Sequence, residues 1–234
     1  MSTGLDDARI AKGMRAQLAL RKRRFEEGAK QAGWKVGLGA PAVKAKLGLA
    51  MPLVGFVLDR ALLPVNAAVS IAGWQKPVAE AEIAAIIGRD LPRDADLQAV
   101  RSAIAALAPA IELADMDCPM DDIEAVLAGD IFQRHVILGP QDETRAGARL
   151  DGLAGSLRRS GADVTVPANL EENTGEIVRI VQHVAAVVAE LGDGLRAGQF
   201  IICGSVTPPM FLQPDETAIE WTLDPIGRAA VRFE

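Results

Sequence analysis

Residues 77–87 read Pro-Val-Ala-Glu-Ala-Glu-Ile-Ala-Ala-Ile-Ile, an apolar run interrupted only by Glu80 and Glu82. The run predicts a buried β-strand, in which residues two apart point to the same face. Glu80 and Glu82 are therefore expected to project together. Burying each carboxylate costs on the order of several kcal/mol. Such a pair persists if it is protonated, if it is paired with Arg or Lys, or if its members share a cation.

A third carboxylate, Glu112, lies in a second apolar strand candidate, Pro109–Asp115. The chain has only two His and two Cys, so a nitrogen or sulfur site for zinc is not expected. Three carboxylates are instead the ligand type for Mg²⁺ or Mn²⁺. The spacing alone leaves an alternative open, in which Glu80 faces the core while Glu82 or Glu112 forms a structural salt bridge.

The remainder of the chain predicts an α+β protein in which strands are in the majority. Apolar residues at helical spacing predict three main helices, over residues 6–31, 96–107 and 175–191. A short helix is expected over residues 41–49, and further strands include residues 55–59, 69–74, 200–203, 217–222 and 228–233. We expect one domain over residues 1–234, with an N-terminal helical segment (1–32) and a β-rich core (33–234).

Composition excludes several classes of partner. Half of the 234 residues are apolar and 24% are charged, as in an ordinary globular protein. A net charge of −6 without a basic stripe argues against a nucleic-acid partner. The chain shows no signal-peptide pattern and no apolar run of the roughly 18 residues that a membrane helix needs. The expectation is a cytoplasmic protein with no membrane partner.

Lys35 and Asp59 are the candidates for proton handling. Lys35 lies in an apolar strand between Gly33 and Gly37, and glycines on both sides suggest a backbone that another group approaches closely. A partly desolvated lysine near a metal could move protons; the alternative is an exposed lysine at a strand end. Asp59 could orient Lys35 or a water, or it could simply begin a turn.

A Gly-Ser turn follows the last strand candidate of the core. Gly204, Ser205 and Thr207 lie between the strand of residues 200–203 and two prolines. The turn offers backbone N–H groups and two hydroxyls to an anion such as a carboxylate. It could equally be a rigid turn without a ligand.

Five segments, taken together, resemble the 2-keto-4-pentenoate hydratase and 4-oxalocrotonate decarboxylase family of the fumarylacetoacetate hydrolase superfamily. Their order and approximate spacing agree over about residues 30–234. The segments are Gly33-Trp-Lys-Val-Gly-Leu38, Gly55-Phe-Val-Leu-Asp59, Ala79-Glu-Ala-Glu-Ile-Ala84, Pro109-Ala-Ile-Glu-Leu-Ala-Asp115, and Leu195-Arg-Ala-Gly-Gln-Phe-Ile-Ile-Cys-Gly-Ser-Val-Thr-Pro-Pro209.

The resemblance implies a β-rich fold of the fumarylacetoacetate hydrolase type, a single catalytic domain and a homo-oligomer. It implies Mg²⁺ or Mn²⁺ on Glu80, Glu82 and Glu112. Lys35 and Asp59 fall at proton-handling positions. Gly204, Ser205 and Thr207 fall on the loop that closes over the substrate.

The implied activity is a metal-dependent hydratase acting on a small 2-hydroxy-2,4-dienoate or 2-oxo-4-enoate. The alternatives are a 2-oxo acid decarboxylase, a C–C bond hydrolase, or a non-catalytic partner subunit that binds a 2-oxo acid.

Two departures from the family pattern concern substrate contacts. Where the hydratases usually continue Asn-Ala-Ser after the position of Asp130, this chain has Ile131-Phe-Gln133. Where they often have Asp-Ser-Arg after the third glutamate, it has Asp115-Met-Asp117, so an expected arginine is missing. Gln133, with its neighbours Arg134 and His135, is a candidate to replace the lost contacts.

Overall fold

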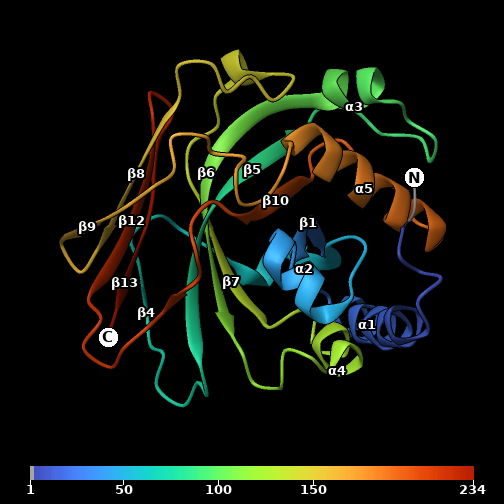
Figure 1. Cartoon of the computed structure of the whole chain (residues 1–234), viewed down its shortest axis with the longest axis horizontal. Coiled ribbons are helices and arrows are strands. Elements are labelled where there is room, and N and C mark those ends of the chain that lie inside the picture. The colour runs from blue at the N-terminus through green and yellow to red at the C-terminus, as the bar shows by residue number, and fades with distance from the viewer. Residues whose placement is uncertain (1–2) are drawn as a thin grey trace.

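Two β-sheets form the framework of the computed structural model, which describes residues 3–234 (Figure 1). The larger sheet has the order β2 (Leu53–Leu58), β1 (Gln31–Gly37), β10 (Phe200–Ser205), β5 (Pro77–Ile87), β6 (Ile104–Asp115), β7 (Gln133–Leu138) and β3 (Leu62–Leu63), with β11 (Met210–Phe211) paired to β5. The smaller sheet has the order β4 (Ala67–Val69), β13 (Gly227–Phe233), β12 (Ala218–Asp224), β8 (Ala154–Arg159) and β9 (Ala162–Val164).

The helices flank the larger sheet on the side away from the smaller one (Figure 1). They are α1 (Ala8–Glu26), α2 (Pro41–Leu47), α3 (Leu97–Ala103), α4 (Ile123–Ala128) and α5 (Ile177–Glu190). Valines of α5, including Val181, Val184 and Val188, are fully buried, because the apolar residues recur at helical spacing and form one face. None of the helices within residues 3–234 combines the length and apolarity needed to cross a bilayer.

The long antiparallel pair β5–β6 forms the centre of the larger sheet. Its register places Glu80 opposite Glu112 and Ala84 opposite Ala108. Odd-numbered residues of β5 belong to the main hydrophobic core. The even-numbered Ala84 joins Ala108 and Ala110 of β6 in a second, smaller apolar cluster on the opposite face. Side chains alternate between the two faces of a strand, so Glu80, Glu82 and Glu112 lie on the same face as this second cluster.

Trp221 on β12 joins the two sheets. Its side chain is fully buried at their junction, where β12 and β13 contact β6. Its indole N–H donates to the backbone carbonyl of Glu82 at 2.8 Å. The strand that carries two of the glutamates is therefore braced from the smaller sheet.

The predicted fold class, α+β and β-rich, is confirmed, and helices α1, α2 and α5 lie where the pattern predicts them. The helix predicted over residues 96–107 is too long. It ends at Ala103, because the following residues from Ile104 pair with β5 and extend β6. The strand predicted over residues 69–74 is also wrong beyond Val69, since a turn with Gly73 at φ +83° follows. Met1 and Ser2 of the predicted N-terminal segment lie outside the described residues.

Trp221→Ala tests the brace between the sheets. Removing a fully buried indole leaves a cavity and an unpaired carbonyl, so the free energy of unfolding should fall by about 3–5 kcal/mol in urea titrations. Phe25→Ala, at a 39%-exposed position, is the control and should cost less than about 1 kcal/mol. Equal losses in the two variants would contradict the role given to Trp221.

Candidate metal centre and cavity

Three glutamates meet on one face of the β5–β6 pair. One carboxylate oxygen from each of Glu80, Glu82 and Glu112 lies within 4.8 Å of the other two. Glu82 and Glu112 are fully buried, whereas Glu80 is partly exposed. The expectation that Glu80 and Glu82 share a face is confirmed, and the strand register adds Glu112 to them.

Lys35 is the basic partner of this cluster. Its ammonium donates to Glu112 Oε1 and, at 2.9 Å, to the backbone carbonyl of Ile131. The lysine is 2% exposed, so the alternative of an exposed lysine at a strand end is wrong. The salt bridge proposed as an alternative for Glu112 does form, but it accounts for only one of the three carboxylates.

Two of the remaining carboxylate oxygens have no hydrogen-bond partner among the described residues. Glu82 Oε2 accepts the backbone N–H of Gly204 at 2.6 Å, but Glu82 Oε1 and Glu112 Oε2 are buried without a hydrogen-bond partner among the described residues. Buried polar atoms are normally satisfied. Three carboxylates against one ammonium also leave two negative charges in excess. A divalent, oxygen-preferring ion fits both the unsatisfied oxygens and the excess charge.

Burial perturbs the ionisation of the whole cluster. Burial and the charge of Glu112, opposed by Lys35, raise the pKa of Glu80 to about 7. Burial likewise raises the pKa of Glu82 well above its usual range, and it raises the pKa of Glu112. Burial alone would lower the pKa of Lys35, but the Glu112 carboxylate together with Asp130 and Glu80 outweighs it, so the net shift is upward. Without a cation, the cluster retains protons that ordinary glutamates lose.

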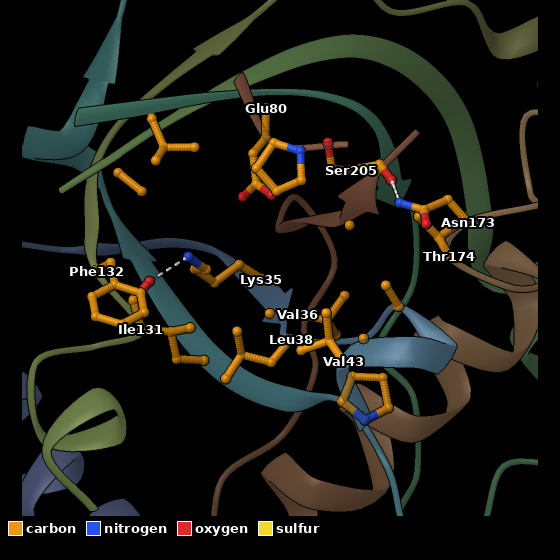
Figure 2. Close-up of a pocket in the computed structure, with 18 of the residues that line it drawn as sticks. Lys35, Val36, Leu38, Val43, Glu80, Ile131, Phe132, Asn173, Thr174 and Ser205 are labelled. Carbon is orange, nitrogen blue, oxygen red and sulfur yellow. Dashed lines mark hydrogen bonds between the residues drawn. The ribbon is translucent and has the colours of Figure 1, made fainter. Parts of the chain in front are cut away.

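A cavity of about 160 Å³ opens above Glu80 and Lys35 (Figure 2). Gly204 and Ser205 line it, as the sequence predicts. The hydroxyl oxygen of Ser205 is buried without a hydrogen-bond partner among the described residues, while its backbone carbonyl accepts from Asn173 Nδ2 at 2.8 Å. One side of the cavity therefore carries polar groups, among them a hydroxyl without a partner among the described residues.

Of the glutamates, only Glu80 belongs to the lining of this cavity. Three further predicted site residues, outside the glutamate cluster, do not line it either. Thr207 is buried beside the loop, and its hydroxyl donates to the carbonyl of Pro208 at 3.3 Å. Asp59 is exposed, and its carboxylate accepts the backbone N–H groups of Lys30 and Arg60. The expectation that it orients Lys35 is thus not met, and its turn alternative holds.

Gln133 is the third of these residues. It lines a separate cavity together with Asp130, Arg24 and Arg134. Its position on β7, facing that second cavity, places it away from the residues that surround Glu80. The structure therefore does not support Gln133 as a replacement contact at the glutamate cluster.

The turn Asp130–Phe132 was missed as a site element. All three residues have positive φ, at 59°, 53° and 64°, which costs of order 1–3 kcal/mol for each non-glycine residue. The turn brings the Ile131 carbonyl to Lys35 and buries Asp130, whose Oδ1 accepts the backbone N–H of Phe56 at 2.9 Å. The negative charge of Asp130 also helps to raise the pKa of Lys35. No periodic signal marks such a turn in the sequence.

The fold and this cluster together define a protein with three closely spaced carboxylates, two of them fully buried, beside a small cavity. Residues 30–234 match the fumarylacetoacetate (FAA) hydrolase C-terminal family. The chain belongs to that family.

Relatives with established names agree with this assignment. The chain is 26% identical over 233 residues to a 2-keto-4-pentenoate hydratase of Paraburkholderia xenovorans, with 98% of this chain and 84% of that protein covered. It is 26% identical to a 4-oxalocrotonate decarboxylase of Pseudomonas putida, with coverages of 93% and 83%. A structure of 4-oxalocrotonate decarboxylase from Pseudomonas putida G7, complexed with magnesium and adipate, superposes with a TM-score of 0.87 at 25% identity, covering 100% of this chain and 90% of that chain.

Glu82→Gln tests the metal centre. An amide at this position removes one charged ligand, so the heat of Mg²⁺ binding in a calorimetric titration should disappear, together with the Mg²⁺-dependent rise in melting temperature. Glu176→Gln, at an exposed position, should titrate like the unmodified protein. Unchanged Mg²⁺ binding by Glu82→Gln would count against the cluster as the site.

The raised pKa of Glu80 predicts an inverted pH dependence for the metal-free protein. The Glu80 carboxyl has a pKa near 7 in the folded state and near its ordinary value in the unfolded state. At a pH between these two values, the folded state therefore binds more protons than the unfolded state. The free energy of unfolding in chelator should therefore fall, by up to about 3 kcal/mol, as pH rises from about 4.5 to about 7. Glu80→Gln should flatten this slope in urea titrations. A stability that rises across the same window would contradict the assignment.

Proposed function

We propose that the protein is a divalent-metal-dependent lyase that hydrates a small 2-hydroxy-2,4-dienoate or its 2-oxo-4-enoate form, with Mg²⁺ or Mn²⁺ as the cofactor. The observation that carries the proposal is the group of three glutamates, two of which have a buried oxygen without a hydrogen-bond partner, with Lys35 beside them and an adjoining cavity. The family relationship and the named hydratase relatives support the same class of reaction.

Each residue of the site has a separate task in this proposal. Glu80, Glu82 and Glu112 would hold the ion, which when bound supplies a Lewis acid for the oxygens of a 2-oxo acid. The Ser205 hydroxyl, which has no internal partner, would bind the acid's carboxylate. Lys35, buried beside Glu112 and within the field of Asp130, would hold or move the proton that the substrate exchanges when it ketonises.

The cavity walls serve the same chemistry by excluding water. Apolar side chains such as Val36, Leu38 and Phe132 surround the approach to Lys35 (Figure 2). In such surroundings the charges of Lys35 and the glutamates are screened little, so they act strongly on a bound acid. A small acid that replaces water in the cavity would be oriented with its carboxylate toward the ion that the glutamates would hold and toward Ser205.

We also propose a cellular compartment and an oligomeric state for the protein. The free cysteines Cys118 and Cys203 are in keeping with a reducing, cytoplasmic compartment. We expect a homo-oligomer in which each chain acts as a single catalytic domain, and light scattering of the purified protein would measure that state.

Incubation of the Mg²⁺-loaded protein with 2-hydroxypenta-2,4-dienoate tests the reaction. The dienol absorbance should disappear with formation of the hydrated 2-oxo acid, and Lys35→Met should slow the loss at least about 100-fold while Mg²⁺ binding persists. Release of CO₂ from a 2-oxo diacid, without hydration, would favour the decarboxylase alternative. No turnover of several dienoates by metal-loaded protein would contradict the hydratase proposal.

A further inference from the structure

The polar and apolar linings of the main cavity lie on different sides. Figure 2 shows Asn173, Thr174 and Ser205 on one side of Lys35, and Ile131 and Phe132 on the other. Most of the rest of the lining consists of hydrocarbon and thioether side chains. Its members include Leu38, Val43, Met116, Met120, Ile131 and Phe132.

No free positive charge faces this apolar lining. Among residues 3–234, Lys35 is the only basic residue that lines the cavity, and its ammonium is already bound to Glu112 and to the Ile131 carbonyl. The ammonium of Lys76 lies 4.7 Å from the centroid of the ring of Phe211, which is a lining residue, but Lys76 itself does not line the cavity. A negative charge placed deep in the apolar part would find no partner there.

The apolar wall is held in place by a costly backbone conformation. Ile131 and Phe132 both have positive φ, a region that side chains, and β-branched ones above all, rarely adopt. Ile131 also packs so closely on β1 that a Cβ at Gly37 would lie 2.5 Å from its Cγ2. Strain of this kind persists only where the surroundings enforce it. The wall is therefore a preformed surface of the cavity.

From these observations we propose that the site selects a 2-oxo or 2-hydroxydienoic acid whose far end is uncharged and apolar, and that it discriminates against acids with a second carboxylate. The proposal rests on the proposed function, because it takes the glutamates and Ser205 as the place where the first carboxylate is held. A second carboxylate at the far end would be stripped of water against Ile131, Phe132 and the two methionines without a hydrogen bond or cation in return.

The charge balance of the cavity acts in the same direction. The three glutamates, Lys35 and a divalent ion together carry no net charge. The first carboxylate of the substrate already makes this ensemble negative. A second carboxylate in the same enclosed space would add repulsion to the cost of its desolvation.

Binding of a matched pair of acids tests the proposal without requiring turnover. Calorimetric titration of the Mg²⁺-loaded protein with 2-oxohexanoate and with 2-oxohexanedioate compares acids of equal length, identical at the metal-binding end. We expect 2-oxohexanoate to bind at least 10-fold more tightly. Equal affinities, or tighter binding of the diacid, would overturn the inference. If neither acid binds although Mg²⁺ does, the proposed function itself fails, and the inference falls with it.

A charge placed in the apolar wall provides the matched variant. Met120→Arg adds a guanidinium to the lining and should raise the affinity for 2-oxohexanedioate at least 10-fold, whereas Met120→Leu should keep the preference for 2-oxohexanoate. Thr165→Arg adds the same charge at an exposed position outside the cavity and should change neither affinity by more than 2-fold. If Thr165→Arg raised the affinity for 2-oxohexanedioate as much as Met120→Arg does, the apolar wall would have no role in the selection.

Discussion

The repulsion among three carboxylates on one buried face is the constraint on which the rest of the structure depends. Glu82 and Glu112 are completely shielded from water, and Glu80 opens only to the cavity. Lys35 neutralises one charge, and the Gly204 N–H stabilises another. What remains is an excess of negative charge in a medium of low polarity, which proteins tolerate when the groups take up protons or bind a cation. The fold therefore has to accommodate this buried negative charge.

The arrangement of strands fixes the positions of these charged groups and of their partners. Strand β10 lies between β1 and β5. The Lys35 side chain therefore reaches the glutamates from β1, a strand that is not paired with β5 or β6. The β5–β6 register fixes Glu112 opposite Glu80, and Trp221 holds the backbone of Glu82 from the second sheet. The strained turn at residues 130–132 then presents the Ile131 carbonyl to the ammonium. Each contact limits the freedom of a charged group that would otherwise move away from its neighbours.

The sequence predicts the parts of this site that depend on local periodicity. The alternation in β5 was enough to place Glu80 and Glu82 on one face, because the period of a strand is two. The register that adds Glu112 is a tertiary property, and spacing alone left it open. The same holds for the overlong helix at residues 96–107, whose end is set by pairing of Ile104 onward with β5. Asp130 and Asn173 reach the site from irregular segments, which carry no periodic signal.

A crystal structure of the protein grown with Mn²⁺ and oxalate tests the central claim most directly. We expect one anomalous manganese peak within coordination distance of carboxylate oxygens from Glu80, Glu82 and Glu112, with oxalate completing the ion's ligands on the cavity side. Lys35 should keep its contact with the Ile131 carbonyl. No manganese at the three carboxylates, or a glutamate turned away from an occupied ion, would contradict the account.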